Sequence, residues 1–216
     1  YLDTIRQLLF DGEQKNATDL AMEKFMSQPL GQERYQPFAD LIMSFPGHEK
    51  ATEYYRDLNL ETGVATTTYK IDDVTFTRQV FATAVDDILV VQLSCDQPGK
   101  IDVSLGLECP HSEIKQRAEK GELHLKGQVS DYIHEREKQK RVSALKFASL
   151  ISAEPDGGDM AVNGDNLEIK GATSVLIKIT AATNYVNYRD ISAYPPRLCI
   201  DKMNDVKEKS FDQLLA

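Results

Sequence analysis

Two pairs of adjacent aspartates are the first candidates in this sequence for catalytic residues. Asp72 adjoins Asp73, and Asp86 adjoins Asp87. Two acids hydrolyse a glycosidic bond when they face each other across a sugar, about 5–10 Å apart. Both pairs instead fall between runs of alternating apolar and polar residues, where aspartate is favoured for turn geometry alone. We therefore interpret both pairs as hairpin turns and assign no catalytic residue to this chain.

The sequence motifs of metal sites and of activated nucleophiles are also missing from this sequence. The four histidines lie far apart in the sequence, without the spacing typical of metal ligands. The sequence has no glycine-rich nucleotide loop, no HExxH motif and no GxSxG elbow, so it predicts no metal and no cofactor. Cys95, Cys109 and Cys199 are sparse and are interpreted as free thiols, with a bond between the first two as the alternative.

Aromatic and amide side chains form the only clusters that suit a sugar. Tyrosine has a flat apolar face, and an amide can bridge two hydroxyl groups. The alternative, which we favour, is that the tyrosines pack against helices and the asparagines satisfy the backbone of a loop. The candidate sugar-proximal residues are Tyr35, Gln36, Asn184 and Tyr188.

The stretch from Gly63 to Leu107 organises the rest of the chain. It alternates β-branched or aromatic residues with polar ones, which is the signal of strands, and its links are short. We expect a four-stranded antiparallel meander, which needs a second layer to bury its inner face. Its strands are predicted at Val64–Ile71, Val74–Ala84, Asp87–Cys95 and Lys100–Leu107.

The remaining elements follow from the same periodicities. Helices are predicted over residues 1–11, 13–27 and 201–214, and Pro110–Gly121 is expected to be a loop or a weak helix. Asp131–Arg141 carries charges of both signs and is interpreted as a solvated hairpin tip. Pro155–Gly158 is interpreted as a hairpin turn. Further strands are expected at 35–45, 54–60 and 122–129, followed by a second meander at 142–153, 160–162, 167–170 and 174–182.

Composition fits one large domain. The chain has 216 residues, of which 41% are hydrophobic and 27% charged, and a net charge of −9. This acidic balance argues against nucleic acid as a partner. No stretch approaches the roughly 20 apolar residues that cross a membrane. The first residue, Tyr1, already lies in a helical pattern, so we expect an excised or processed chain. The predicted fold is mainly β: a large two-layer antiparallel sandwich with a helical hairpin at its N-terminus and a helix at its C-terminus.

Several segments, in this order, resemble the opening of glycoside hydrolase family 95. The resemblance covers most of the chain and weakens between Pro110 and Arg141. At Asp73 the sequence departs from the family, in which glycine often follows aspartate in this turn. The matching segments are Leu2–Gly12, Lys24–Met26, Tyr35–Leu41, Tyr55–Leu60, Gly63–Tyr69, Val74–Ala82, Pro98–Lys100 and Ala181–Tyr188.

The resemblance implies a supersandwich of the galactose-mutarotase type. Family 95 enzymes are mostly inverting α-L-fucosidases that release terminal 1,2-linked fucose, and some prefer α-L-galactose. The resemblance also implies a bacterial, secreted or periplasmic protein that degrades polysaccharides. The family's catalytic groups, a glutamate acid and a water activated by asparagine and aspartate, lie in an (α/α)6 barrel. The implied partners are therefore this downstream barrel and a glycan.

Two organisations follow. In the first, residues 1–200 are the accessory sandwich of a glycosidase, incomplete at its N-terminus, and residues 201–216 begin the helical linker to the barrel. In the second, the chain is a freestanding carbohydrate-binding or interaction module that shares the sandwich. The ordered matches favour the first organisation, although a fold alone does not fix a function.

Overall fold

The computed structural model describes residues 1–26, 35–134 and 138–216, which divide into two compact units, Tyr1–Pro37 and Phe38–Ala216. The first unit contains helices α1 (Leu2–Phe10) and α2 (Gln14–Lys24), which contact each other. Gly12 lies between them with φ +78°, a left-handed conformation that costs glycine little and ends α1. The predicted helical hairpin is therefore confirmed. Residue 27, the last in the predicted second helix, lies outside the described residues.

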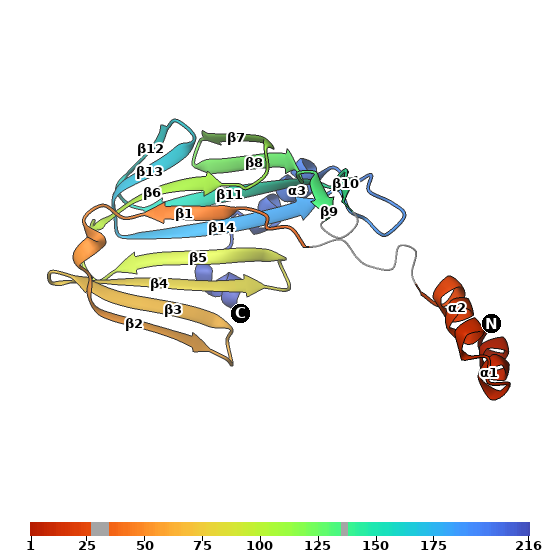
Figure 1. Cartoon of the computed structure of the whole chain (residues 1–216). Helices are drawn as coiled ribbons and strands as arrows, with labels where there is room; N and C mark the ends of the chain where they lie inside the picture. Colours follow the sequence, from red (N-terminus) through yellow and green to blue (C-terminus); the bar gives the residue numbers. More distant parts are fainter. Residues whose placement is uncertain (27–34, 135–137) are drawn as a thin grey trace. The chain divides into compact units, whose positions relative to one another are not determined.

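A large antiparallel sheet forms the centre of the second unit (Figure 1). Its strand order among the described residues is β2-β3-β4-β5-β14-β11-β8-β7. Central strands such as β5 and β11 carry apolar residues on both faces, because both faces are covered. The strands are β2 (Thr52–Asn59), β3 (Val64–Ile71), β4 (Val74–Thr83), β5 (Ile88–Cys95), β7 (Glu113–Glu119), β8 (Glu122–Gln128), β11 (Lys146–Asp156) and β14 (Ser174–Thr183).

A smaller antiparallel sheet packs on one face of the large one, with the order β1-β6-β13-β12 among the described residues. A short 3-10 helix, η1 (His48–Lys50), connects β1 to β2. Strands β9 (Tyr132–His134) and β10 (Gln139–Arg141) pair as the predicted hairpin, although its tip at 135–137 lies outside the described residues. The smaller sheet consists of β1 (Asp40–Ser44), β6 (Ile101–Glu108), β12 (Asp159–Asn163) and β13 (Asn166–Ala172).

Two apolar clusters hold three layers together. The first cluster lies between the sheets and includes Val91, Leu105 and Ile177. The second lies on the outer face of the large sheet, where Val90 and Leu150 pack against helices α3 (Pro195–Val206) and α4 (Phe211–Leu215). Burying apolar surface on both faces of one sheet is the main stabilising contribution of this arrangement. The predicted mainly β sandwich is therefore confirmed. Within the described residues, no helix combines the length and apolar character needed to cross a bilayer.

The expected meanders are wrong in their connections, although their strands are present. Strand β6 leaves the large sheet and pairs with β1 and β13, because the position beside β5 is occupied by β14. The segment at Pro155–Gly158 is likewise not a hairpin turn, since β11 belongs to the large sheet and β12 to the small one. Gly158 lies at this corner with φ +71° and passes close to the backbone of Gly171.

Several predicted elements differ in type or extent. Pro110–Gly121 is not a loop or weak helix, since β7 forms there as an edge strand paired with β8. The first strand begins at Asp40 rather than residue 35. The single helix expected at 201–214 is two helices. The first begins earlier, at the Pro195-Pro196 pair, because proline is favoured at the first helical positions.

Candidate functional site

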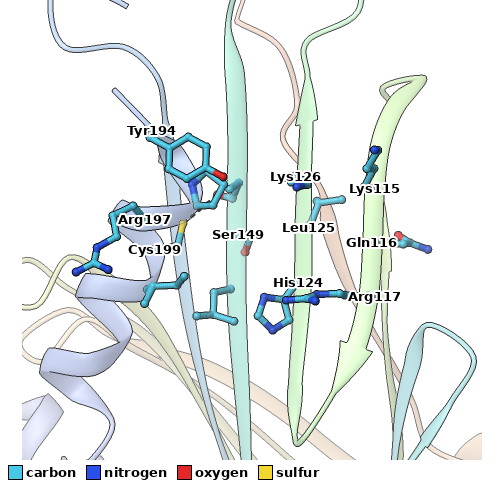
Figure 2. Close-up of a pocket in the computed structure, with 14 residues that line it drawn as sticks. Lys115, Gln116, Arg117, His124, Leu125, Lys126, Ser149, Tyr194, Arg197 and Cys199 are labelled. Carbon is cyan, nitrogen blue, oxygen red and sulfur yellow. Dashed lines mark hydrogen bonds between the residues drawn. The ribbon is translucent and has the colours of Figure 1, made fainter. Parts of the chain in front are cut away.

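Two adjoining cavities form a groove on the outer face of the large sheet, beside the start of α3. Figure 2 shows the residues that line the first of them. The volumes of the two cavities are about 570 and 690 Å³, within the range of small-ligand sites. Strands β7, β8 and β11 form the floor, and the segment that leads into α3 forms the opposite wall. We call this the lysine groove. Both cavities are lined by Lys115, Lys126, Tyr194 and Pro196.

Three lysines give the groove its charge. Lys115 and Lys126 lie directly opposite each other on β7 and β8, and Lys146 extends the floor on β11. Like charges directly opposite each other in a sheet are destabilising. Among the described residues, no carboxylate lies within salt-bridge distance of these three side chains. The groove is therefore a positively charged site on a chain whose net charge is −9.

The two arginines of the groove each pair with a carboxylate, and its histidine lies beside one. Arg117 pairs with Glu119 at 2.7 Å. His124 lies 3.0 Å from Glu122. On the helical side, Arg197 pairs with Asp201 one turn along α3, at 2.9 Å. The unneutralised positive charge of the groove is therefore concentrated on its lysines.

The groove can bind a ligand, but its side chains do not form an acid–base pair. Of the described residues that line the two cavities, Glu113 is the one carboxylate. Cys199 lines the first cavity but is 1% exposed, and burial raises the pKa of its thiol. Its Sγ donates to the carbonyl oxygen of Ala148 at 3.3 Å, so it is a core residue rather than a nucleophile. The described residues also contain no cluster of histidine, cysteine, aspartate or glutamate placed to hold a metal.

Asn184, one of the predicted sugar-proximal residues, lines the second cavity but is committed to the backbone. Its side-chain oxygen accepts from the amide of Lys146 at 2.8 Å. Its side-chain nitrogen donates to the carbonyl oxygens of Ala144 and Ile191. The side chain is 5% exposed and has its hydrogen-bonding groups occupied, so it ties β11 to the loop before α3. A role for Asn184 near a sugar remains a prediction.

The other predicted sugar-proximal residues are exposed. Tyr188 is 79% exposed, with the guanidinium of Arg189 4.9 Å from the centre of its ring. Tyr35 and Gln36 are exposed and belong to the first compact unit, whereas Asn184 and Tyr188 belong to the second. A role for Tyr35, Gln36 and Tyr188 near a sugar remains a prediction.

The two aspartate pairs occupy turns, as predicted. Asp72 and Asp87 adopt left-handed φ angles of 50° and 53° in the β3–β4 and β4–β5 turns. The second pair has a further role that the sequence did not reveal. Asp86 accepts from Nζ of Lys209 at 2.5 Å, and Asp87 accepts from Lys202. The β4–β5 turn thereby anchors the C-terminal helices.

Sequence reasoning missed the lysine groove. Its lysines are separated by 11 and 20 positions along the chain (126 − 115 and 146 − 126). They come together only through the pairing of β7, β8 and β11. Alternation over residues 122–129 places Lys126 on the strand face that does not carry the buried leucines, but the partner segment is predicted as a loop or a weak helix. A strand predicted at Glu113–Glu119, paired with the next strand, would have placed Lys115 beside Lys126.

Comparisons with known proteins relate this chain to enzymes that act on carbohydrates by their names and family descriptions. Residues 1–188 match the model of the family described as "Glycosyl hydrolase family 65, N-terminal domain". "Alpha-L-fucosidase 2" of Arabidopsis thaliana is 25% identical over 237 residues, and the match covers 100% of this chain but 28% of that protein. A solved structure, "Putative kojibiose phosphorylase from human microbiome", has a TM-score of 0.49 and 10% identity over 81% of this chain and 26% of its own.

The family match and the curated relative confirm the resemblance to the N-terminal part of a glycoside hydrolase. The family match covers more than half of this chain, whereas the chain itself spans 28% of the length of its curated relative. The chain therefore belongs to the family of N-terminal domains of glycosyl hydrolase family 65.

Proposed function

We propose that this chain is the accessory N-terminal sandwich of an exo-acting α-L-fucosidase. The whole protein would release terminal 1,2-linked L-fucose, with inversion, from a glycan. The observation that carries the proposal is the relationship to an α-L-fucosidase along the entire chain, at 25% identity. Residues 1–200 would form the sandwich, and residues 201–216 would begin the linker to a downstream (α/α)6 catalytic domain.

The chemistry of the described residues supports an accessory role. Hydrolysis with inversion requires two facing carboxyl groups with room for a water molecule between them. Glu113 is the one carboxylate among the described residues of the lysine groove. The aspartates of the β4–β5 turn bind lysines of the C-terminal segment. These two aspartates therefore hold the domain together, and we assign the bond-breaking groups to the rest of the protein.

Substrate choice and stereochemistry test the proposal on the full-length gene product. We expect release of L-fucose from 2'-fucosyllactose, with β-L-fucose as the first anomer seen by proton NMR. The matched substrate is the corresponding α-L-galactoside, which differs by one hydroxyl group. Faster release of galactose would change the assigned sugar to L-galactose. Cleavage of neither substrate would contradict the proposed activity.

A further inference from the structure

The inner face of the large sheet extends beyond the small sheet that covers it. Strand β2 is exposed along its whole length, including Tyr54 and Leu58 at 57% each. Beside β1, the inner faces of β2, β3 and β4 form a cavity of about 540 Å³, with Met43 of β1 in its wall. Figure 1 shows β2, β3 and β4 at one end of the large sheet, with β2 as the edge strand. This open strip is the second cationic surface of the domain.

An arginine–threonine–arginine row crosses the open strip. Arg56 on β2 lies opposite Thr67 on β3, which lies opposite Arg78 on β4. Residues directly opposite each other in an antiparallel sheet share a face, so the two arginines flank one threonine. Arg78 in turn lies opposite Leu93, a member of the inter-sheet core, which places the row on the inner face. All three side chains line the same cavity.

Asp57 also lines this cavity, but within the described residues it forms no salt bridge with either arginine. Among the described residues, no carboxylate lies within salt-bridge distance of either guanidinium. Arg78 is nevertheless half-buried, and Thr67 between the two arginines is 6% exposed. Partly desolvating a cation without a counter-charge is unfavourable. Two guanidinium forks on one face can each donate two parallel hydrogen bonds to a planar carboxylate.

Apolar rows flank the arginines on both sides. Leu58, Ala65 and Val80 form an aliphatic row on one side. On the other side, the ring of Tyr69 lies 6.4 Å from that of Tyr54 and 5.5 Å from that of Phe76, centre to centre. A ligand that fits this strip has one anionic group for the arginines and apolar faces for the flanking rows. A pyranose ring with a carboxylate has both.

Edge-to-edge pairing with a second copy does not explain the strip. Strand β2 is the edge of the sheet, but its register shifts between Thr52 and Tyr55, and Glu53 has a φ of 51°. A bulge of this kind interrupts the ladder and protects an edge from pairing. The charge of Glu53 is also directed to Lys70, at 2.7 Å. The face of β2–β4, rather than its edge, is therefore the binding surface.

We propose that this strip binds a uronic acid residue of a glycan, with Arg56 and Arg78 on its carboxylate. The choice of a sugar acid rests on the proposed action on glycans, whereas the choice of a carboxylate rests on the arginine row alone. The cavity volume of about 540 Å³ suits a short oligosaccharide. The site is separate from the lysine groove, which lies on the opposite face of the sheet.

Isothermal titration of the 216-residue chain with tri-galacturonate tests the proposal. We expect saturable binding that weakens as salt is raised, because the contact is ionic. The methyl-esterified trimer, which keeps the shape but lacks the charge, should not bind. Arg56→Gln and Arg78→Gln should each weaken binding about tenfold, and Arg56→Lys should weaken it less, because the charge remains without the fork. Arg56 is exposed, so its variants test the site without disturbing the core.

The variant Arg6→Gln, which removes an exposed arginine of α1 that lies in neither proposed binding surface, is the matched control and should bind tri-galacturonate as the wild type does. Equal loss of binding in this variant and in Arg56→Gln would overturn the assignment. So would equal binding of the esterified trimer, or no saturable binding of tri-galacturonate. None of these binding measurements depends on fucose release. The proposed binding site can therefore be contradicted while the proposed activity is confirmed, and the reverse.

Discussion

Lys178 on β14 is fully buried and donates from Nζ to both carboxylate oxygens of Glu154 on β11, at 2.9 and 3.1 Å. The same nitrogen donates to the carbonyl oxygen of Lys207, the C-terminal capping residue of α3, at 2.7 Å. One ammonium group thus connects two strands of the large sheet to the end of the helix that covers them. The pair is asymmetric, because the Lys178 side chain is 0% exposed and that of Glu154 is 40% exposed.

This asymmetry predicts different costs for the two halves of the pair. Glu154→Ala leaves a buried ammonium without its counter-charge and should lower the free energy of unfolding by about 3 kcal/mol. Lys178→Met removes the buried charge, and Glu154 can turn to water, so the loss should be about 1 kcal/mol. Urea unfolding measures both. Glu208→Ala, which removes one partner of an exposed pair at 3.9 Å, is the control and should cost almost nothing. A larger loss for Lys178→Met than for Glu154→Ala would contradict this assignment.

The β4–β5 turn predicts a second difference in stability. The Asp86 side chain is 11% exposed against Lys209, whereas that of Asp87 is 77% exposed against Lys202. Asparagine keeps the turn, since it tolerates the left-handed φ of Asp87. Asp86→Asn should therefore cost about 1–2 kcal/mol, and Asp87→Asn less than about 0.5 kcal/mol. Equal losses in urea unfolding would show that burial does not decide the strength of these anchors.

His48 predicts a pH dependence of stability on the acidic side. Its Nδ1 lies 2.8 Å from the hydroxyl of Tyr69, and its ring packs on Phe45 and Phe76. Burial lowers the pKa of His48 below its ordinary 6.5, against smaller opposing effects of Glu49 and Asp102. The unfolded chain then binds a proton more readily than the folded one. This stability is complete above pH 6.5 and is lost as the pH falls towards the lowered pKa of the folded state.

His48→Gln should remove this part of the pH dependence. Urea midpoints of the wild type should fall between about pH 7.5 and about pH 5, and those of the variant should fall less. The quantity compared is the slope of the urea midpoint against pH in each protein. An overall destabilisation by the substitution shifts the midpoints at every pH alike and does not change this slope. Parallel slopes would mean that His48 does not contribute.

The corner between the two sheets predicts a sharp contrast between adjacent glycines. Gly157 and Gly158 have φ angles of 74° and 71°. A Cβ atom would meet nothing within 4 Å at Gly157, but at Gly158 it would lie 2.2 Å from the carbonyl oxygen of Lys170. Gly157→Ala should cost about 1 kcal/mol for the left-handed backbone alone. Gly158→Ala should cost several times more or prevent folding, as thermal unfolding would show. Equal melting temperatures would contradict the close approach.

The strands themselves were predictable where alternation was clean. The bounds of β3 match the prediction, and those of β4 and β5 differ by one residue at one end. Alternation specifies that one face is buried, but it does not specify which sheet a strand joins. The change of sheet between β5 and β6 therefore could not be read from the sequence. Strand β7 was missed because its outward side chains are charged and Ile114 and Ala118 are its few inward apolar ones.

The binding surfaces were less predictable than the strands, because they depend on register. Arg56 and Arg78 share a face only because β3 pairs with both of their strands, with Thr67 between them. Asn184 was correctly placed in a loop next to aromatic residues. Its partners, the backbone groups of β11 and of the loop before α3, are contacts that no local pattern encodes.

The most direct test of the accessory role compares residues 1–216 with the full-length gene product, at equal molar concentration, for fucose release from 2'-fucosyllactose. We predict that the full-length protein releases fucose and that residues 1–216 alone, folded by circular dichroism, release none above the buffer rate. Turnover by the 216-residue chain would contradict the account, because it would place bond-breaking groups among residues to which we assign only structure and binding.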